Sequence, residues 1–297
     1  MHKKFDVQIV TAASILGLKP TGVERLPEFL LSEGLKERLN SRNDIINVST
    51  FNDLYVNERE HGAVLNASSL RLFSDGLNKT ISNLDITKKF ALVLGGDCSV
   101  LIGIMSSLKS KGTFGLFFLD AHADFYEPEK SITGEAADMD LALITGRGPD
   151  ILTDIDGAKP YVRDSHVIHI GQRDMEETSK FHSREIRSTE IKCVDFIRLQ
   201  KDGFENLLTE IKEYVSKITV DGFWIHFDTD VIDDEENPAV DYRLPGGMSF
   251  QQCEATLLNL LQEYPTIGMS VTIFNPNLDP ERKVSKQIVS LLSNVLA

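Results

Sequence analysis

Acidic residues and one histidine follow a short apolar run near the middle of the chain. Residues 120–124 read Asp-Ala-His-Ala-Asp, directly after the apolar residues 115–119, which are typical of a buried strand in a parallel sheet. In an extended chain, side chains two residues apart point the same way, so we expect Asp120, His122 and Asp124 to project together. Two carboxylates and an imidazole this close repel and desolvate one another unless a cation lies among them. A divalent metal ion is the simplest such cation.

Two further apolar runs end in residue types that bind metals. Residues 222–227 lead into aspartates at 228 and 230, and residues 90–94 lead into Gly-Gly-Asp-Cys-Ser at 95–99. An aspartate at a strand end is often only a turn former or a helix cap. However, open α/β sheets gather their chemistry at the carboxyl ends of parallel strands, and six ligands are enough for two ions that share carboxylates. The six candidate metal ligands are Cys98, Asp120, His122, Asp124, Asp228 and Asp230.

The rest of the chain alternates apolar strand-like runs with amphipathic helix-like segments. Further strands are expected at residues 5–10, 45–50, 167–170, 192–196 and 267–274, and helices at 23–39, 61–84, 99–109, 138–144, 204–218, 249–264 and 280–296. This alternation predicts an α/β fold with three α/β/α layers and a mostly parallel central sheet. Because no repeat or linker interrupts the pattern, we predict a single domain over residues 1–297.

Composition narrows the classes of protein and partner. A net charge of −14 argues against nucleic acid as a partner, since phosphates require a basic surface. No apolar run reaches the length of a membrane span, so we expect no membrane partner, and the N-terminus lacks the apolar core of a signal peptide. The three cysteines are odd in number and far apart, which is typical of free thiols in a reducing cytoplasm. The expected location is therefore cytoplasmic.

Taken together, the motifs resemble those of the arginase, agmatinase and formimidoylglutamase family, the ureohydrolases. The family's motifs read G-G-D-H-S, D-A-H-x-D and S-F-D-x-D-x-x-D-P. The corresponding segments here are G-G-D-C-S at 95–99, D-A-H-A-D at 120–124 and H-F-D-T-D-V-I-D-D at 226–234. Residues 170–174, I-G-Q-R-D, are similar to a further family motif, I-G-x-R-D.

The resemblance implies an arginase-like fold, a homo-oligomer (a trimer or hexamer), and two divalent metal ions, Mn²⁺ in the family. A metal-bridging hydroxide would attack a non-peptide C–N bond of a small linear amidine or guanidine compound. Carried over by position, one ion would be held by residues 98, 120, 124 and 228, and the other by 120, 122, 228 and 230, with Asp120 and Asp228 bridging. The resemblance also makes Asp124 the catalytic residue, which would accept a hydrogen bond from the hydroxide and move its proton.

Three departures from the family pattern bear on the reaction. The family's histidine is Cys98 here, which either ligates as a thiolate, suiting Zn, Fe or Ni better than Mn, or is a small buried hydrophobe with one ion lost. Ile273 occupies the place of the glutamate that holds the guanidinium. An isoleucine cannot pair with a cation, so either the substrate lacks a guanidinium or another acid binds it. The loop at 133–139 lacks the family's proton-shuttling histidine.

Other polar residues admit two interpretations each. Glu135 and Asp138 could replace the missing histidine or contact substrate, or they could only cap a helix. Arg147 could bind a substrate carboxylate or be a solvated loop residue. His226 could support the metal ligands from behind or be a hydrogen-bonded core histidine.

We therefore predict a metal-dependent hydrolase of non-peptide carbon–nitrogen bonds with a small-molecule substrate. Two alternatives remain, namely a hydrolase or deacetylase of a neutral amide and a catalytically inactive relative that acts as a binding module.

Overall fold

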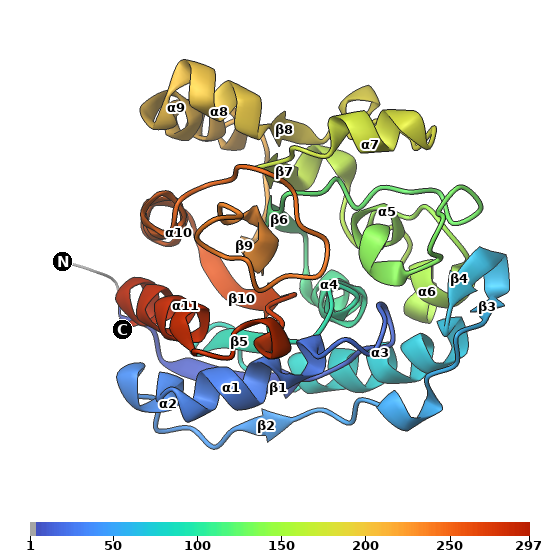
Figure 1. Cartoon of the computed structure of the whole chain (residues 1–297), viewed down its shortest axis with the longest axis horizontal. Coiled ribbons are helices and arrows are strands. Elements are labelled where there is room, and N and C mark those ends of the chain that lie inside the picture. The colour runs from blue at the N-terminus through green and yellow to red at the C-terminus, as the bar shows by residue number, and fades with distance from the viewer. Residues whose placement is uncertain (1–3) are drawn as a thin grey trace.

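The structure, a computed structural model, describes residues 4–297 and is built around one eight-stranded sheet (Figure 1). All neighbouring strands in this sheet run parallel, in the order β2-β1-β5-β10-β9-β6-β7-β8. The strands are β1 (Val7–Ala12), β2 (Ile46–Asn47), β5 (Phe90–Gly95), β6 (Phe114–Leu119), β7 (Val167–Ile170), β8 (Lys192–Val194), β9 (Gly222–Asp228) and β10 (Thr266–Thr272). A separate antiparallel pair joins β3 (Arg59–Glu60) to β4 (Val64–Leu65).

Helices cover both faces of the sheet, as the alternation of elements predicts. The helices are α1 (Leu26–Ser32), α2 (Leu35–Arg38), α3 (Ala67–Ser82), α4 (Val100–Lys111), α5 (Asp140–Ile144), α6 (Asp150–Thr153), α7 (Met175–Lys180), α8 (Phe196–Asp202), α9 (Phe204–Val215), α10 (Phe250–Glu263) and α11 (Lys283–Leu296). One apolar core lies between the sheet and helices α1, α2 and α8 to α11, and the other lies under α3 to α6 (Figure 1). The α/β/α fold class is confirmed.

Alternate residues of each central strand supply the two cores. Along β6, Phe117 and Leu119 pack into the first core while Leu116 and Phe118 pack into the second. Because both faces are covered, the strand is apolar throughout and every one of its residues is buried. The four central strands are therefore held rigidly and end at closely matched levels, with Leu119 opposite Phe227 and Asp228 opposite Thr272.

Three expected elements differ from the structure. The expected helix at 23–39 is divided into α1 and α2 at Gly34, whose positive φ of 83° ends one helix and starts the next. The expected strand at 45–50 pairs over only two residues, and the expected helix at 61–84 begins at Ala67 because the residues before it form the β3–β4 pair. In the part of the chain that the structure describes, the helices lack the length and apolar character needed to cross a bilayer.

Candidate metal centre

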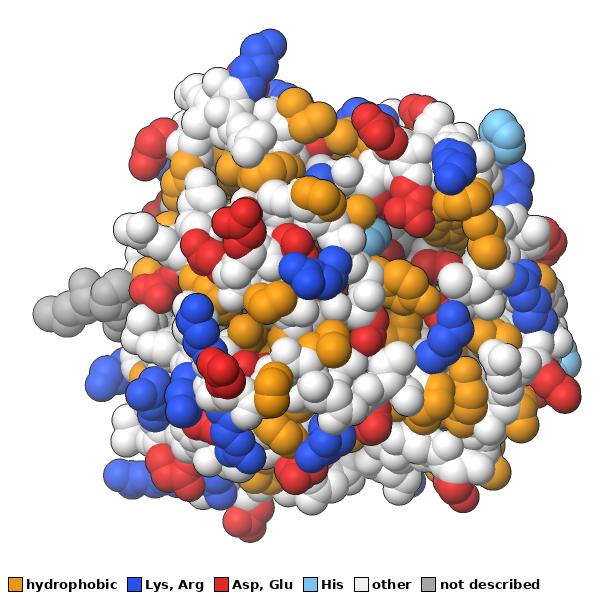
Figure 2. All heavy atoms as spheres, viewed as in Figure 1, with side chains coloured by type: hydrophobic (Ala, Val, Ile, Leu, Met, Phe, Trp, Pro, Cys, Tyr) orange, Lys and Arg blue, Asp and Glu red, His pale blue; other side chains and the backbone are white. Residues whose placement is uncertain are grey.

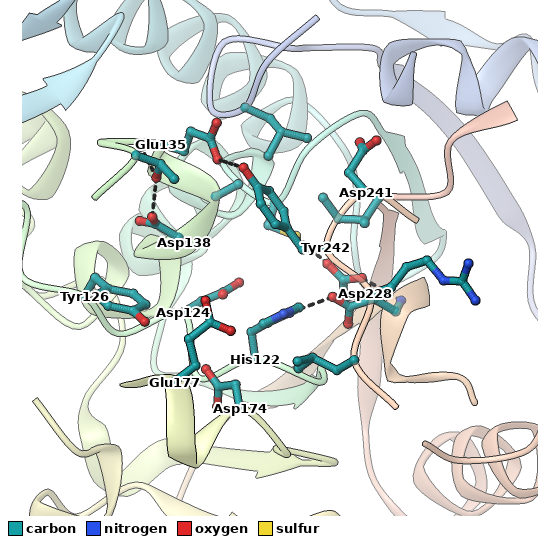
Figure 3. Close-up of a pocket in the computed structure, with 18 of the residues that line it drawn as sticks. His122, Asp124, Tyr126, Glu135, Asp138, Asp174, Glu177, Asp228, Asp241 and Tyr242 are labelled. Atoms are coloured by element: carbon teal, nitrogen blue, oxygen red, sulfur yellow. Dashed lines mark hydrogen bonds and ion pairs between the residues drawn. The ribbon is translucent and has the colours of Figure 1, made fainter. Parts of the chain in front are cut away.

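The six residues singled out in the sequence lie together at the carboxyl ends of three central strands (Figure 3). Cys98 follows β5, the residues at 120, 122 and 124 follow β6, and β9 ends at Asp228 with Asp230 in the next turn. All of them except Asp120 line a cavity of about 260 Å³, and four of these five lining residues carry an acidic or imidazole group. Asp124 reaches the cavity from a backbone with a positive φ of 44°, which turns the chain sharply after the strand.

Two groups of these side chains are spaced closely enough to hold one metal ion each. Ligand atoms of Cys98, Asp120, His226 and Asp228 all lie within 4.8 Å of one another, and so do those of Asp120, His122 and Asp124. Asp120 belongs to both groups. Asp230 joins them through His122, whose Nδ1 lies 2.7 Å from Asp230 Oδ2. The structure therefore brings all six predicted residues together and adds His226.

The electrostatics of this cluster fit a bound cation. Asp120 is fully buried, and its Oδ2 has no hydrogen-bond donor among the described residues. Burial, followed by the neighbouring carboxylates, raises the pKa of Asp120, Asp124 and Asp228 well above the ordinary value. Burial acts on Asp230 in the same direction, but the adjacent His122 outweighs it and lowers the pKa of Asp230. A divalent ion among these oxygens would replace mutual repulsion by attraction.

Cys98 is in the thiol form in this arrangement. Its Sγ donates a hydrogen bond to Asp228 Oδ2 at 2.8 Å and lies 3.2 Å from Thr272 Oγ1. Burial, followed by Asp228 and other nearby carboxylates, raises the pKa of the Cys98 thiol well above its ordinary value. A coordinated metal ion reverses this preference, because it deprotonates a thiol that binds it.

The mouth of the cavity carries several acidic side chains. Glu135 accepts a hydrogen bond from Tyr242 Oη at 2.8 Å (Figure 3). Glu135 also pairs with Lys19 Nζ at 3.2 Å, and Asp138 accepts a hydrogen bond from Ser131 Oγ at 2.8 Å. Neither carboxylate caps the short helical segments beside it. The remaining acidic side chains of the lining outside the metal cluster are Asp174, Glu177 and Asp241. Figure 2 shows acidic side chains around the hollow on this face of the molecule.

Arg147, the third residue considered for substrate contact, lies outside the cavity lining. Its guanidinium forms two hydrogen bonds with Asp164, from Nη1 at 2.8 Å and from Nη2 at 2.5 Å. It also lies over the ring of Phe125, 4.8 Å from the centroid. The structure therefore gives Arg147 an internal carboxylate partner, which leaves its fork of donors unavailable to a substrate.

Comparison with known proteins supports the same assignment. The arginase family model matches residues 7–297. The chain belongs to the arginase family. Arginases of Staphylococcus aureus (strain MRSA252) and Bacillus subtilis (strain 168) are 29% and 26% identical to it, and each alignment covers 98% of this chain and 97% of the relative. The crystal structure of arginase from Bacillus caldovelox has a TM-score of 0.85 at 25% identity, covering 99% of this chain and 98% of the other.

Membership of the arginase family makes the chain a ureohydrolase, that is, a hydrolase of non-peptide carbon–nitrogen bonds with a binuclear divalent metal centre. The crystal structure of arginase from Bacillus cereus shares the fold with a TM-score of 0.85 at 24% identity. The central sheet with its ligands at the strand ends is thus the arginase fold.

One wall of the cavity departs from the arginase family pattern. Ile273, at the family's glutamate position, directly follows β10 with a positive φ of 71°, which is a strained conformation for a β-branched residue. Its N–H donates to Gly96 O at 2.9 Å, which holds the turn against the end of β5. Ile273 packs with Leu18, Cys98 and Ala137 in an apolar cluster. The wall beside Cys98 is therefore apolar.

Sequence reasoning missed a seventh carboxylate beside the arginase-family ligands. Asp140, the first residue of α5, is fully buried, and its carboxyl faces that of Asp124. The signal was the acidic residue two positions after Asp138, which the sequence analysis placed only within the expected helix at 138–144. Tyr126 and Tyr242, which loops bring to the cavity, and Glu177, which the short helix α7 brings there, were also missed.

Proposed function

We propose that the chain hydrolyses a C–N bond of a small linear amidine or guanidine compound that carries a positive charge away from the reacting carbon. The observation that carries this proposal is the cluster in which Asp120 belongs to two ligand groups, at the base of a cavity with an acidic mouth. The family membership supports the type of bond cleaved.

We assign the six predicted residues to two divalent ions. Cys98, Asp120, Asp124 and Asp228 would hold one ion, and Asp120, His122, Asp228 and Asp230 would hold the other. When bound, the two ions supply a water whose pKa is lowered toward neutrality and which can act as the nucleophile. Mn²⁺ is the ion that the family resemblance favours, whereas the sulfur of Cys98 favours Zn, Fe or Ni.

Asp124 is the residue proposed to move the proton. Its carboxyl lies in the cavity lining, so it can accept a hydrogen bond from the attacking water and then carry its proton toward the departing amine. Asp140 faces the same carboxyl from the buried side, and burial, which raises the pKa of both acids, favours a hydrogen bond between the two carboxyls. Asp140 thereby fixes the orientation of Asp124.

The acidic mouth determines which substrates enter. Glu177 and Asp241 lie on the cavity lining, and their negative charges favour a cationic amine and repel a carboxylate. An amino acid such as arginine presents both groups, whereas a simple guanidino amine presents only cations. We therefore expect simple guanidino or amidino amines to be better substrates than arginine.

The apolar wall favours a second candidate function, hydrolysis or deacetylation of a neutral amide. The side chain of Ile273 lies in the lining beside Cys98, where a charged guanidinium would lose water without gaining a carboxylate. A neutral acyl group avoids this cost.

We also propose that residues 1–297 act as one domain, because strands from residue 7 to residue 272 belong to the same sheet. The free thiols support a location in the cytoplasm. The family resemblance supports a homo-oligomer, either a trimer or a hexamer.

The test compares three compounds of matched length on protein loaded with Mn²⁺ or Zn²⁺: a guanidino amine, an N-acetyl diamine and arginine. The proposal expects urea and a diamine from the guanidino amine, faster than from arginine, and no reaction in an Asp120→Asn variant. Acetate from the N-acetyl diamine as the main product would favour the second candidate. Failure of all three compounds with protein that holds two ions per chain would overturn both functions.

A further inference from the structure

His226 lies directly behind Asp228 on β9. The two residues are separated by one position in a strand, so their side chains lie on the same face of the sheet. A ring nitrogen of His226, Cys98 Sγ and one carboxylate oxygen each of Asp120 and Asp228 form a group. All four atoms lie within 4.8 Å of one another. One nitrogen, one sulfur and two oxygens at such spacing match a four-coordinate site for a divalent ion of the zinc type.

The hydrogen bonds of the ring leave one nitrogen available. Nδ1 of His226 lies 2.9 Å from Ser270 Oγ, which also accepts a hydrogen bond from Trp224 Nε1 at 3.1 Å. Nε2 has Thr272 Oγ1 at 3.5 Å, the limit of a useful hydrogen bond. A histidine that binds a metal ion characteristically donates its other ring N–H to a protein group, and Ser270 provides that acceptor here.

The ring of His226 is fully buried and held in one orientation. Its plane stacks on Phe118 with centroids 5.0 Å apart, which fixes the direction of Nε2. A buried Nε2 without a short hydrogen bond is costly in a histidine that only fills the core.

The sequence differs from the family motifs at both of these positions. The family motif G-G-D-H-S has cysteine at position 98 here, and the motif S-F-D has histidine at position 226. An imidazole is thus absent from the turn after β5 and present near the carboxyl end of β9, at the same cluster.

We propose that His226 is a metal ligand and that, together with Cys98, it gives one of the two ions a nitrogen and sulfur environment. This inference rests on the proposed binuclear centre and deepens it. Its consequence is unequal sites: the ion at Cys98 and His226 would be of the zinc or cobalt type, while the site of His122 and the aspartates suits manganese. Binding at the first site would release the thiol proton that Cys98 now donates to Asp228.

The test is a Co²⁺ titration of metal-free protein, which gives two dissociation constants and the thiolate-to-cobalt charge-transfer absorption. We expect His226→Gln to weaken one ion by about tenfold or more, to leave the other unchanged and to alter the charge-transfer band. His169→Gln is the matched control, because His169 is also fully buried and its ring also packs on Phe118, with centroids 5.1 Å apart. It should leave the band unchanged.

A second variant keeps the inference testable if His226→Gln does not fold. Cys98→His combined with His226→Ser returns the imidazole to the turn after β5, and we expect it to bind two ions, to lose the charge-transfer band and to bind Mn²⁺ more tightly at the changed site. Two unchanged dissociation constants and an unchanged band in His226→Gln would overturn the role of His226. Fewer than two ions in the unaltered protein would overturn the proposed function, and this inference with it.

Discussion

Replacing Asp120 by asparagine should raise the stability of the metal-free protein and lower the stability of the metal-loaded protein. Asp120 is fully buried, and only one of its oxygens has a protein donor, since Oδ1 accepts from His122 N at 2.7 Å. Asparagine keeps that acceptor and removes an acid whose ionisation is opposed by burial and by Asp124, Asp230 and Asp228. Without metal the variant should therefore be more stable than the unaltered protein.

The size of the effect follows from the chain length and the number of ions. Removing a buried acid that must either stay charged among carboxylates or take up a proton on folding should raise the free energy of unfolding by about 1–3 kcal/mol. For 297 residues the entropy of unfolding is about 0.6 kcal/mol/K, so the metal-free Tm should rise by about 2–5 °C. Each ion at about 1,000 times its Kd adds about 4 kcal/mol, so two ions raise the Tm of the unaltered protein by about 13 °C. Because Asp120 is proposed to bind both ions, the variant should lose most of this gain.

Differential scanning calorimetry with chelator and with excess metal measures both effects. Asp279→Asn is the matched control, because this buried aspartate accepts hydrogen bonds from the backbone N–H groups at 283, 284 and 285 at the start of α11, away from the cavity. It should lower the Tm by a similar amount with and without metal. A lower metal-free Tm for Asp120→Asn, together with an undiminished metal-induced rise, would refute the reasoning.

Three further predictions follow from other residues. Burial raises the pKa of Asp138 from 3.8 to about 7, so between these pH values the native state holds a proton that the unfolded chain has lost. The stability that this proton contributes is complete below pH 3.8 and should disappear as the pH rises to about 7. Asp138→Asn should remove a decline of about 1.4 kcal/mol per pH unit across that interval, measured by denaturant unfolding, and an unchanged slope would contradict this. Arg147→Lys should lower the free energy of unfolding by about 1–3 kcal/mol, because lysine cannot reproduce the two hydrogen bonds to Asp164, and the metal content should stay the same. Loss of catalysis without loss of stability would instead indicate that Arg147 binds substrate. Ile273→Glu should lower the KM for a guanidino amine by about tenfold through a new charge pair, and an unchanged KM would show that the cation binds elsewhere.

The sequence was sufficient to predict the central strands and the ligands that they carry. Runs such as residues 115–119 are apolar throughout because both faces of the sheet are covered, and this places the following Asp120 and His122 at a strand end. Strand-end residues are positioned by local geometry alone. The six candidate ligands could therefore be named before their neighbours in space were known.

Residues whose position depends on long loops could not be assigned in this way. Asp140 begins a short helix in sequence, and only the folding of the loop after β6 brings its carboxyl to Asp124. The sequence does not show that Arg147 forms hydrogen bonds with Asp164, seventeen positions later, which makes its guanidinium unavailable to a substrate. The sequence does not decide between the two interpretations of His226. Alternation along β9 predicts the face of the sheet on which His226 lies, but not its distance to Cys98, which follows another strand.

Anomalous X-ray diffraction from crystals loaded with Mn²⁺ or Zn²⁺ tests the central claim most directly. The account predicts two peaks per chain about 3.5–4 Å apart, both within bonding distance of the carboxylate of Asp120, at the carboxyl ends of β5, β6 and β9. A single peak, or two peaks that do not share Asp120, at saturating metal would contradict a binuclear hydrolytic centre in this chain.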